Sequence, residues 1–359
     1  MKTRIRNIHF FRATSAISKP IADATHAIPE IAFLITRIEV ESGVTGESNL
    51  LAFHYSPKAI TGALYDVRQI ALEFEVWETG KFLERVEQES EYFGRQGINR
   101  WAAGAINIAM WDAWARTLEQ PVWKLFGACR DKVPVYGSGG WLSYSLEELV
   151  DEARAYARRG FTAVKIKVGS SELERDIERI ARVRETIGSR MKIMIDANQG
   201  MNVVSALELA RRTESYNLHC FEEPISNTDF DGYAHLRSHC GIPLAMGERE
   251  FDTTALRELM SRNAIDIWQP DILRLGGVEG WRGSALQAQS RGIRVQPHYY
   301  KEYDVPLLCT VPNGYCCESF DWIDGLMDKP IEICEGFARP SSAPGWGFQF
   351  KDEFLTALN

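Results

Sequence analysis

Three acidic residues recur at an even interval in the middle of the chain, each near the end of a short apolar run. Asp196 ends IMID, Glu222 stands in CFEEP and Glu248 in AMGERE, and neighbouring members are 26 residues apart. One strand–helix unit of an α/β barrel takes roughly 25–35 residues. The interval therefore predicts three carboxylates at one level on three adjacent parallel strands. A hard divalent cation such as Mg²⁺ would offset their mutual repulsion.

Further polar residues follow the other short apolar runs. They are Lys165, Lys167, Asn198, Asp271, His298 and Glu318. Taken singly, each has a simpler interpretation: the KIK pair as a solvated face, Asp271 as a helix cap, His298 as a turn residue. Seven of the eight predicted strands nevertheless carry an ionisable group at the same end. In barrel enzymes that end holds the catalytic residues.

These residue types suit the removal of a proton next to a carboxylate. A metal bound to the substrate's carboxylate acidifies the α-proton, and the metal and nearby lysines stabilise the resulting enediolate. A lysine can act as the base when a second ammonium group and the metal lower its pKa. A histidine held by an aspartate supplies a second acid or base on the opposite side.

The elements that must position these groups begin at Val133. From there short strands alternate with amphipathic helical segments such as 145–160 and 172–188, which predicts an α/β fold with a parallel barrel. An open doubly wound sheet is the alternative, but it usually carries a glycine-rich phosphate fingerprint after its first strand, and none is seen. The predicted strands are 133–140, 161–169, 191–198, 218–224, 242–248, 266–271, 293–298 and 314–320.

The first 125 residues show a different order of predicted elements. IRNIHFFRATS and EIAFLITRIEVES read as strands, and the helical stretches that follow include 99–127, which is apolar nearly all round and so predicts a buried helix. Strands followed by helices indicate an α+β domain. We therefore expect an α+β domain over 1–125, a barrel over 126–328, and an irregular segment, 329–359, that packs back on the first domain.

Composition narrows the classes of partner. The 359 residues are 45% hydrophobic and 25% charged with a formal net charge of −8, which fits a soluble protein and lacks the basic block that nucleic-acid binding requires. No apolar stretch approaches the ~20 residues of a membrane-spanning helix, and the N-terminus lacks the shape of a signal peptide. Seven cysteines without a CxxC pair predict reduced thiols and a cytoplasmic location.

Several segments, in their order and spacing, resemble the enolase superfamily and within it the mandelate racemase subgroup. They are NIAMWDAWARTLEQPVWKLFG, KIK, IDANQ, FEEP, QPDILRLGGVEGW, QPH and CES. The resemblance implies an α+β capping domain on a modified TIM barrel, (β/α)7β. It also implies Mg²⁺, a small carboxylate substrate, and a homo-oligomer, often a dimer or an octamer. Enolase-superfamily enzymes use a Lys or His base, with Mg²⁺ stabilising the enediolate.

Carried over by position, the resemblance assigns roles to the polar strand ends. Asp196, Glu222 and Glu248 would ligate the metal, with Glu223 behind them. The residues implied in acid/base chemistry or at the substrate's carboxylate are Lys167, His298 with its partner Asp271, Lys165, Glu318 and Asn198.

The subgroup contains a racemase and many acid-sugar dehydratases, and we expect a dehydratase that forms a 2-keto-3-deoxy acid. A racemase or epimerase of a 2-hydroxy acid is the first alternative, and a non-catalytic sugar-acid-binding protein the second. The capping loops 15–30 and 50–59 would bind the far end of the substrate, with His26 and Tyr55 among the candidates. A diacid would need another cation, and the sequence leaves four open: Lys19, Arg249, Arg274 and Lys301.

Overall fold

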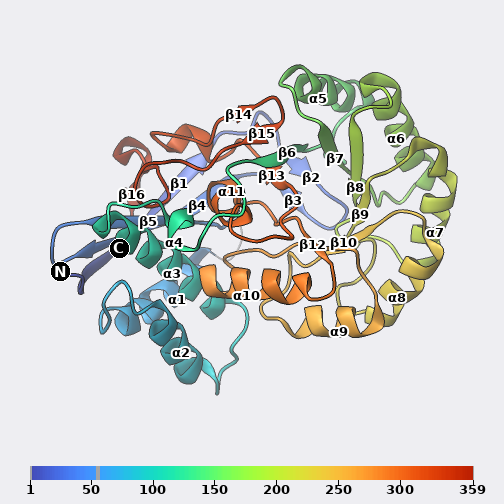
Figure 1. The fold of residues 1–359 in the computed structure, drawn as a ribbon. Helices are drawn as coiled ribbons and strands as arrows, with labels where there is room; N and C mark the ends of the chain where they lie inside the picture. The colour runs from blue at the N-terminus through green and yellow to red at the C-terminus, as the bar shows by residue number, and fades with distance from the viewer. Residues whose placement is uncertain (1, 54–56, 359) are drawn as a thin grey trace.

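The computed structural model describes residues 2–53 and 57–358, which form a cap and a barrel (Figure 1). The barrel takes residues 133–319, and the cap takes the segment before it together with the end of the chain. Side chains of both parts belong to one continuous hydrophobic core. In the described part of the chain, no helix combines the length and the apolar character needed to cross a membrane.

The cap is an antiparallel sheet covered by helices, as the order of its predicted elements indicates. Its strands lie in the order β16-β1-β4-β5, and α3 packs on β5 and α1. Gly46 permits this close approach, because a Cβ there would lie 2.3 Å from the backbone oxygen of Ala109. The main elements are β1 (Ile5–Ser15), β4 (Ile31–Val40), β5 (Thr45–Leu51), α1 (Pro57–Ala71), α2 (Thr79–Ser90), α3 (Ile98–Thr117) and α4 (Val122–Leu125).

The barrel has eight parallel strands with a helix after each of the first seven, so the predicted (β/α)7β architecture is confirmed. Hydrogen-bonded neighbours run from β12 through β6 to β13, and a parallel bridge between Val295 and Gly314 closes the ring. The strands are β6 (Val133–Ser138), β7 (Ala163–Lys167), β8 (Lys192–Asp196), β9 (Cys220–Glu222), β10 (Leu244–Met246), β11 (Ile267–Trp268), β12 (Arg294–Val295) and β13 (Cys317–Ser319). Each lies inside its predicted range and is shorter than that range.

The helices cover the outside of the barrel, and Figure 1 shows α5 to α9 along its outer edge. They also fix the loops at the strand ends. In α6, Asp176 Oδ2 accepts the backbone N–H of Gly169 at 2.7 Å, and Arg179 donates to the backbone oxygens of Gly140 and Trp141. The helices are α5 (Leu146–Arg158), α6 (Leu173–Ile187), α7 (Val203–Arg212), α8 (Phe230–His239), α9 (Thr254–Arg262), α10 (Val278–Gln289) and α11 (Lys301–Leu308).

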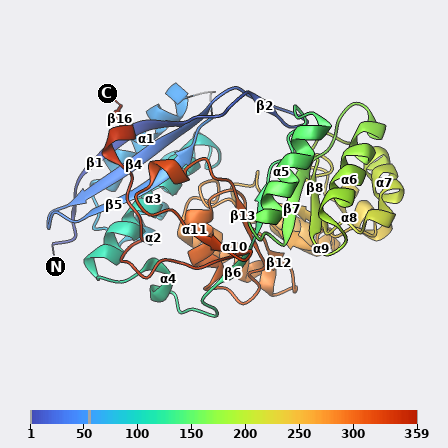
Figure 2. The same ribbon diagram turned by 90° about the horizontal axis from the view of Figure 1, so that it is seen from above.

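A small hairpin of the cap reaches across to the barrel, as Figure 2 shows for β2. It consists of β2 (Ile21–Ala22) and β3 (Ala27–Ile28). The backbone N–H of Leu142 donates to the backbone oxygen of Ala22 at 2.8 Å, and Thr25 Oγ1 donates to the backbone oxygen of Asn198 at 3.3 Å. The hairpin therefore lies against the loops that follow β6 and β8.

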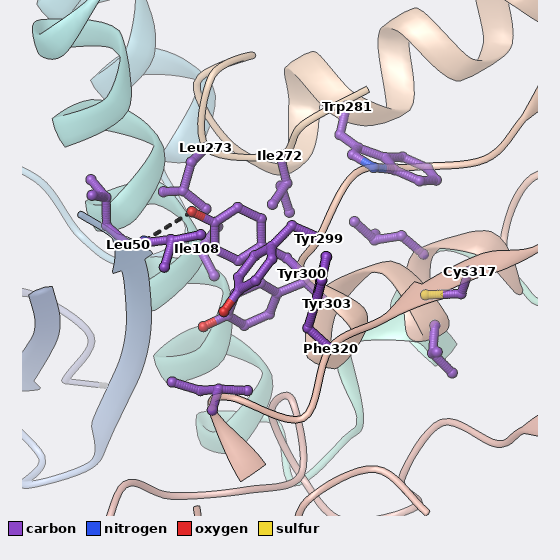
Figure 3. Close-up of a cluster of buried hydrophobic side chains, with 14 of the residues drawn as sticks. Leu50, Ile108, Ile272, Leu273, Trp281, Tyr299, Tyr300, Tyr303, Cys317 and Phe320 are labelled. Carbon is purple, nitrogen blue, oxygen red and sulfur yellow. Dashed lines mark hydrogen bonds between the residues drawn. The ribbon is translucent and has the colours of Figure 1, made fainter. Parts of the chain in front are cut away.

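A second seam joins β5 of the cap to α11 of the barrel through buried polar contacts. The backbone N–H groups of Asn49 and Leu51 donate to the hydroxyls of Tyr303 and Tyr300, each at 3.0 Å. Asn49 Nδ2 donates to Glu302 Oε1 at 2.6 Å. Figure 3 shows the tyrosines packed between Leu50 and other cap side chains on one side and barrel side chains on the other.

The C-terminal segment contacts both parts. The short strands β14 (Ile333–Cys334) and β15 (Phe337–Ala338) form a hairpin, and β15 pairs antiparallel with the start of β6. The last strand, β16 (Thr356–Ala357), pairs with β1. The segment therefore extends the barrel sheet before it returns to the cap.

Candidate active site

Three carboxylates meet at the C-terminal end of the barrel strands. In the parallel ladder Asp196 of β8 lies opposite Glu222 of β9, at the same level as the interval predicts. One oxygen from each of Asp196, Glu222 and Glu248 lies within 4.8 Å of the others. Both Asp196 and Glu222 are completely buried, and Glu248 is 8% exposed. The structure thus brings the three predicted metal ligands together.

Glu248 reaches this cluster by a different route from the one the spacing predicts. Glu222 lies opposite Ala245 in the ladder, and β10 ends at Met246, so Glu248 is two residues beyond its strand. Gly247 permits the chain to turn here. Its φ is +141°, and a Cβ at this position would lie too close to the ring of Trp268 and the backbone of Gln269. The prediction of three carboxylates on three strands is therefore wrong for the third.

The chemistry of the cluster fits a divalent cation. Burial raises the pKa of Glu222 well above its usual value, and Asp196 and Glu248 raise it further while Lys165 opposes them. Such crowding of buried acids is costly without a compensating charge. Three carboxylate oxygens form a ligand set that suits Mg²⁺.

The two lysines of β7 lie against this cluster. Lys167 Nζ is 2.5 Å from Asp196 Oδ2 and 5.2 Å from the ring centroid of Trp141. Lys165 Nζ lies 2.7 Å from Glu222 Oε1 and 2.6 Å from Glu318 Oε1, so it joins β9 to β13. Burial lowers the pKa of both lysines, but the carboxylates beside them raise it by more.

His298 lies on the other side of the triad, because β7 and β12 flank β8 to β10 at opposite ends of that run of strands. Its Nδ1 is 2.8 Å from Asp271 Oδ2, and its Nε2 is 3.7 Å from Glu248 Oε2. Burial lowers the pKa of His298, while Glu248 and Asp271 raise it to a net value of about 9. Asp271 Oδ1 also accepts the backbone N–H groups of Leu273 and Arg274, so it caps a turn as well.

A second layer holds the ligands in place. Glu223 turns away from the triad and accepts from Arg249 Nε at 2.8 Å and from Gln199 Nε2 at 3.2 Å. Burial, followed by the charge of Glu248, raises the pKa of Glu223 to about 8 despite Arg249. Gln269 Nε2 donates to Glu222 Oε2 at 2.6 Å, a buried contact that sequence reasoning missed.

Backbone strain gathers at the same rim. Asn198, Glu223 and Tyr299 adopt positive φ values of 41°, 37° and 70°, each directly after or near a site residue. Such conformations cost of the order of 1–3 kcal/mol each and persist where the surroundings impose them. Asn198 Oδ1 and the Tyr299 hydroxyl are buried without a hydrogen-bond partner among the described residues. Such atoms in a cavity wall mark places where a ligand can bond.

Most of the predicted residues line one cavity between the barrel rim and the cap. Its walls include Lys165, Lys167, Asn198, Glu248, His298 and Glu318 from the barrel and His26 and Asp23 from the hairpin. Arg249 and Arg274 also line it. Of the capping-loop candidates, His26 is thus brought to the cavity, whereas Tyr55 lies outside the described residues.

One wall of the cavity is aromatic, and sequence reasoning missed it. Phe320 stacks on Trp322 with ring centroids 4.4 Å apart, and Trp141 stacks on Trp322 at 5.9 Å. Tyr299 packs against both Phe320 and Trp322. These side chains follow β6, β12 and β13. They therefore stand just past the strand ends, in the same positions as the predicted ionisable residues. Because they are aromatic, they are not among the polar residues predicted at the strand ends.

Comparison with known protein families agrees with this geometry. Residues 6–127 match the mandelate racemase / muconate lactonizing enzyme N-terminal domain, and residues 148–354 match the enolase C-terminal domain-like family. Together the two matches span nearly the whole chain.

Similar proteins include two dehydratases and a racemase. L-talarate/galactarate dehydratase of Salmonella typhimurium is 29% identical over 98% of this chain and 90% of its own. A structure of a variant of that enzyme with Mg and L-glucarate has a TM-score of 0.93 at 27% identity, covering 98% of this chain and 92% of the other. Arabinonate dehydratase of Saccharolobus solfataricus is 30% identical over 88% of each chain. A racemase of Streptomyces coelicolor with bound magnesium has a TM-score of 0.94 at 26% identity, covering 98% and 100%.

Proposed function

Because the chain belongs to the mandelate racemase / muconate lactonizing enzyme family of the enolase superfamily, we propose that it is a Mg²⁺-dependent acid-sugar dehydratase. Such an enzyme removes the α-proton and the 3-hydroxyl group of a sugar acid and yields a 2-keto-3-deoxy acid. The observation that carries the proposal is the position of Lys167 and His298 on opposite sides of three converging carboxylates.

Asp196, Glu222 and Glu248 are the residues that would hold the cation. When bound, Mg²⁺ supplies the positive charge that makes the proton next to the substrate's carboxylate acidic. Lys165 contacts both Glu222 and Glu318. Its ammonium group is therefore positioned to bind the substrate's carboxylate beside the triad. Magnesium is also bound in structures of the similar dehydratase and racemase.

Lys167 is the group we assign to α-proton removal. Its Nζ is held at one side of the triad by Asp196, and the indole of Trp141 covers it. These two contacts fix the amine at the cavity wall. A base held within reach of the α-carbon in this way contributes about 10²–10⁴ to the rate.

His298 is the group we assign to proton delivery onto the departing 3-hydroxyl. Asp271 engages its Nδ1 at 2.8 Å, which leaves Nε2 directed into the cavity. The aspartate is itself fixed by two backbone N–H groups of the turn that follows it, so the imidazole has one preferred orientation. A histidine oriented in this way can act as a general acid.

Racemisation or epimerisation of a 2-hydroxy acid is the second candidate, and the same observation favours it. Two acid/base groups on opposite sides of one carbon can remove a proton from one side and return it to the other. The choice of dehydration rests on the polar residues Asp23, His26 and Asn198 in the cavity wall, which suit a polyhydroxy chain. Both similar dehydratases act, by their names, on sugar acids: one on diacids and one on a monoacid.

Incubation of the Mg²⁺-loaded protein with a panel of sugar acids in D₂O tests the proposal. We expect one or a few acids to give a 2-keto acid, detected as its semicarbazone, with deuterium at C3 of the product. Deuterium at C2 of recovered acid without any keto acid would establish the racemase alternative instead. Binding of acids with neither exchange nor product would identify a non-catalytic sugar-acid-binding protein.

A further inference from the structure

The cavity wall carries two arginines, Arg249 and Arg274, whose role the proton chemistry does not explain. Four cations in the sequence are candidates for binding a second acidic group of a substrate, and the structure separates them. Lys19 pairs with Glu148 on α5 and does not line the cavity. Lys301 is buried between Asp321 and Asp324, 3.2 and 2.7 Å away, and is also absent from the cavity wall.

The two arginines both line the cavity, but they differ in their partners. Arg249 donates to Glu223 at 2.8 Å and lies 3.7 Å from Glu248, and these carboxylates raise its pKa. The charge of Arg249 is therefore paired with Glu223 and with the predicted metal ligand Glu248. Arg274 has no ion pair and no side-chain hydrogen bond among residues 2–53 and 57–358. Of the four candidate cations it is the one with no carboxylate in ion-pair contact within that part of the chain. Glu250 is close enough to interact with it electrostatically, but the carboxylate of Glu250 accepts a hydrogen bond from Asn227 at 2.8 Å.

Arg274 is nevertheless held in a defined position. Its guanidinium carbon lies 4.7 Å from the ring centroid of Trp101, in α3 of the cap, and 5.7 Å from that of Phe251. Its backbone N–H donates to Asp271 Oδ1, so it is part of the turn that orients His298. Aromatic contacts leave all five N–H donors of a guanidinium free to bond another group.

The acidic groups that face the same cavity do not compete for Arg274. Glu248 belongs to the triad, and Glu318 lies against Lys165. Asp23 Oδ1 accepts hydrogen bonds from the backbone N–H groups of Thr25 and His26, so this carboxylate is bonded within its own loop. A ligand with a second anionic end is what would complement the arginine, since a guanidinium pairs with a carboxylate through two parallel hydrogen bonds.

We propose that Arg274 binds a carboxylate at the end of the substrate remote from the triad, so that the preferred substrates are sugar diacids. The inference rests on the function proposed above, since it takes the first carboxylate to bind at the triad. On this proposal a barrel loop, and not the cap hairpin, discriminates between a diacid and a monoacid. The cap contributes Trp101, against which the arginine packs.

Binding of two unreactive acids to the Mg²⁺-loaded protein, measured by calorimetry, tests the proposal. 2-Hydroxyadipate and 2-hydroxyhexanoate have six carbons each and differ only in a terminal carboxylate or methyl group. Neither has the 3-hydroxyl group that dehydration expels. We expect the wild type to bind the diacid about 10- to 100-fold more tightly, the range for a hydrogen bond to a charged group.

Arg274→Met, which keeps an unbranched side chain against Trp101, should abolish that preference and leave the affinity for the monoacid unchanged. Arg274→Lys should retain part of the preference, because an ammonium keeps the charge without the two-pronged donor. Arg257→Met, at an exposed position on α9, is the matched control and should behave as wild type.

Equal affinity for the two acids in the wild type, or no binding of either, overturns the proposal. So does a preference for the diacid that survives in Arg274→Met. A diacid preference without formation of keto acid from any sugar acid would reject the proposed dehydratase and keep the assignment of Arg274. Formation of keto acid from monoacids at the same rate as from diacids would do the reverse.

Discussion

The two walls of the cavity are built in different ways. The barrel wall consists of side chains at strand ends, such as Lys167 and His298, and each is fixed by a short contact to a buried carboxylate. The cap wall consists of a hairpin tip and the end of β5. The hairpin is held mainly by contacts to backbone groups, as in the bonds from Leu142 to Ala22 and from Thr25 to Asn198.

This difference separates two tasks. Parallel strands in a closed ring keep their ends at fixed distances, so side chains there can transfer a proton over a short, constant path. A hairpin can change in length and sequence without disturbing the ring, so it suits contacts that differ between substrates. We therefore expect changes at the strand ends of the barrel wall to act on the rate of chemistry. Changes on the cap wall, and at Arg274 in the loop after β11, should act on substrate choice.

The largest effect should follow loss of the lysine on the barrel wall. We expect Lys167→Ala to lower kcat by at least about 10³-fold, because it removes the base that takes the α-proton. Steady-state kinetics and exchange of the α-proton in D₂O measure it. Lys192→Ala, at the opposite end of the barrel strands, is the control and should retain wild-type kcat. Near-normal exchange in Lys167→Ala would contradict the assignment.

A smaller effect with a distinct signature should follow loss of the histidine. His298→Asn should reduce keto-acid formation by about 10²–10⁴-fold, as for removal of a general acid. Exchange of the α-proton should persist, because Lys167 remains on the other side. Product assays and mass spectrometry of recovered substrate separate the two steps, with His235→Asn on the surface of α8 as control. Equal loss of exchange and product would mean that the two residues do not act in successive steps.

The seam between the two parts should show the smallest effect, on stability and with a defined pH dependence. Burial raises the pKa of Glu302 to about 7, although the hydrogen bond from Asn49 lowers it. The unfolded chain has a glutamate pKa of about 4.3. Between these values the folded state binds more protons than the unfolded state. The free energy of unfolding therefore falls as pH rises from about 5 to above 7.

Glu302→Gln keeps the shape of the side chain and removes the cost of ionising it. We expect the variant to exceed the wild type in unfolding free energy by on the order of 3 kcal/mol at pH 8 and to match it near pH 4. Urea unfolding at the two pH values measures this, and Glu41→Gln at an exposed turn should show no such difference. A gain that is the same at both pH values would refute the assignment of a raised pKa to Glu302.

The barrel wall is the part of the site that the sequence predicts well. Strand alternation and an even repeat suffice to place Asp196 beside Glu222, because the ladder forces residues at equal positions to the same level. Glu248 shows where this fails. A turn at Gly247 carries it past its strand, and no repeat length encodes that turn.

The cap wall and the aromatic wall depend on packing between segments far apart in the chain. His26 faces the cavity because its hairpin rests on the loops after β6 and β8, a contact that periodicity does not reveal. Arg274 differs from Lys19 and Lys301 because it lines the cavity and because each lysine pairs with a carboxylate that is distant in the sequence. The expected homo-oligomer remains a prediction.

Calorimetric titration of Mg²⁺ into the metal-free protein shows whether the three buried carboxylates form one cation site on which the chemistry depends. The wild type should bind one Mg²⁺ per chain and regain keto-acid formation as the site fills. Glu222→Gln, with a circular dichroism spectrum like that of the wild type, should lose both, while the surface variant Glu174→Gln should lose neither. Unchanged binding in Glu222→Gln, or full activity in excess chelator, would mean that the triad does not hold an ion that the reaction needs.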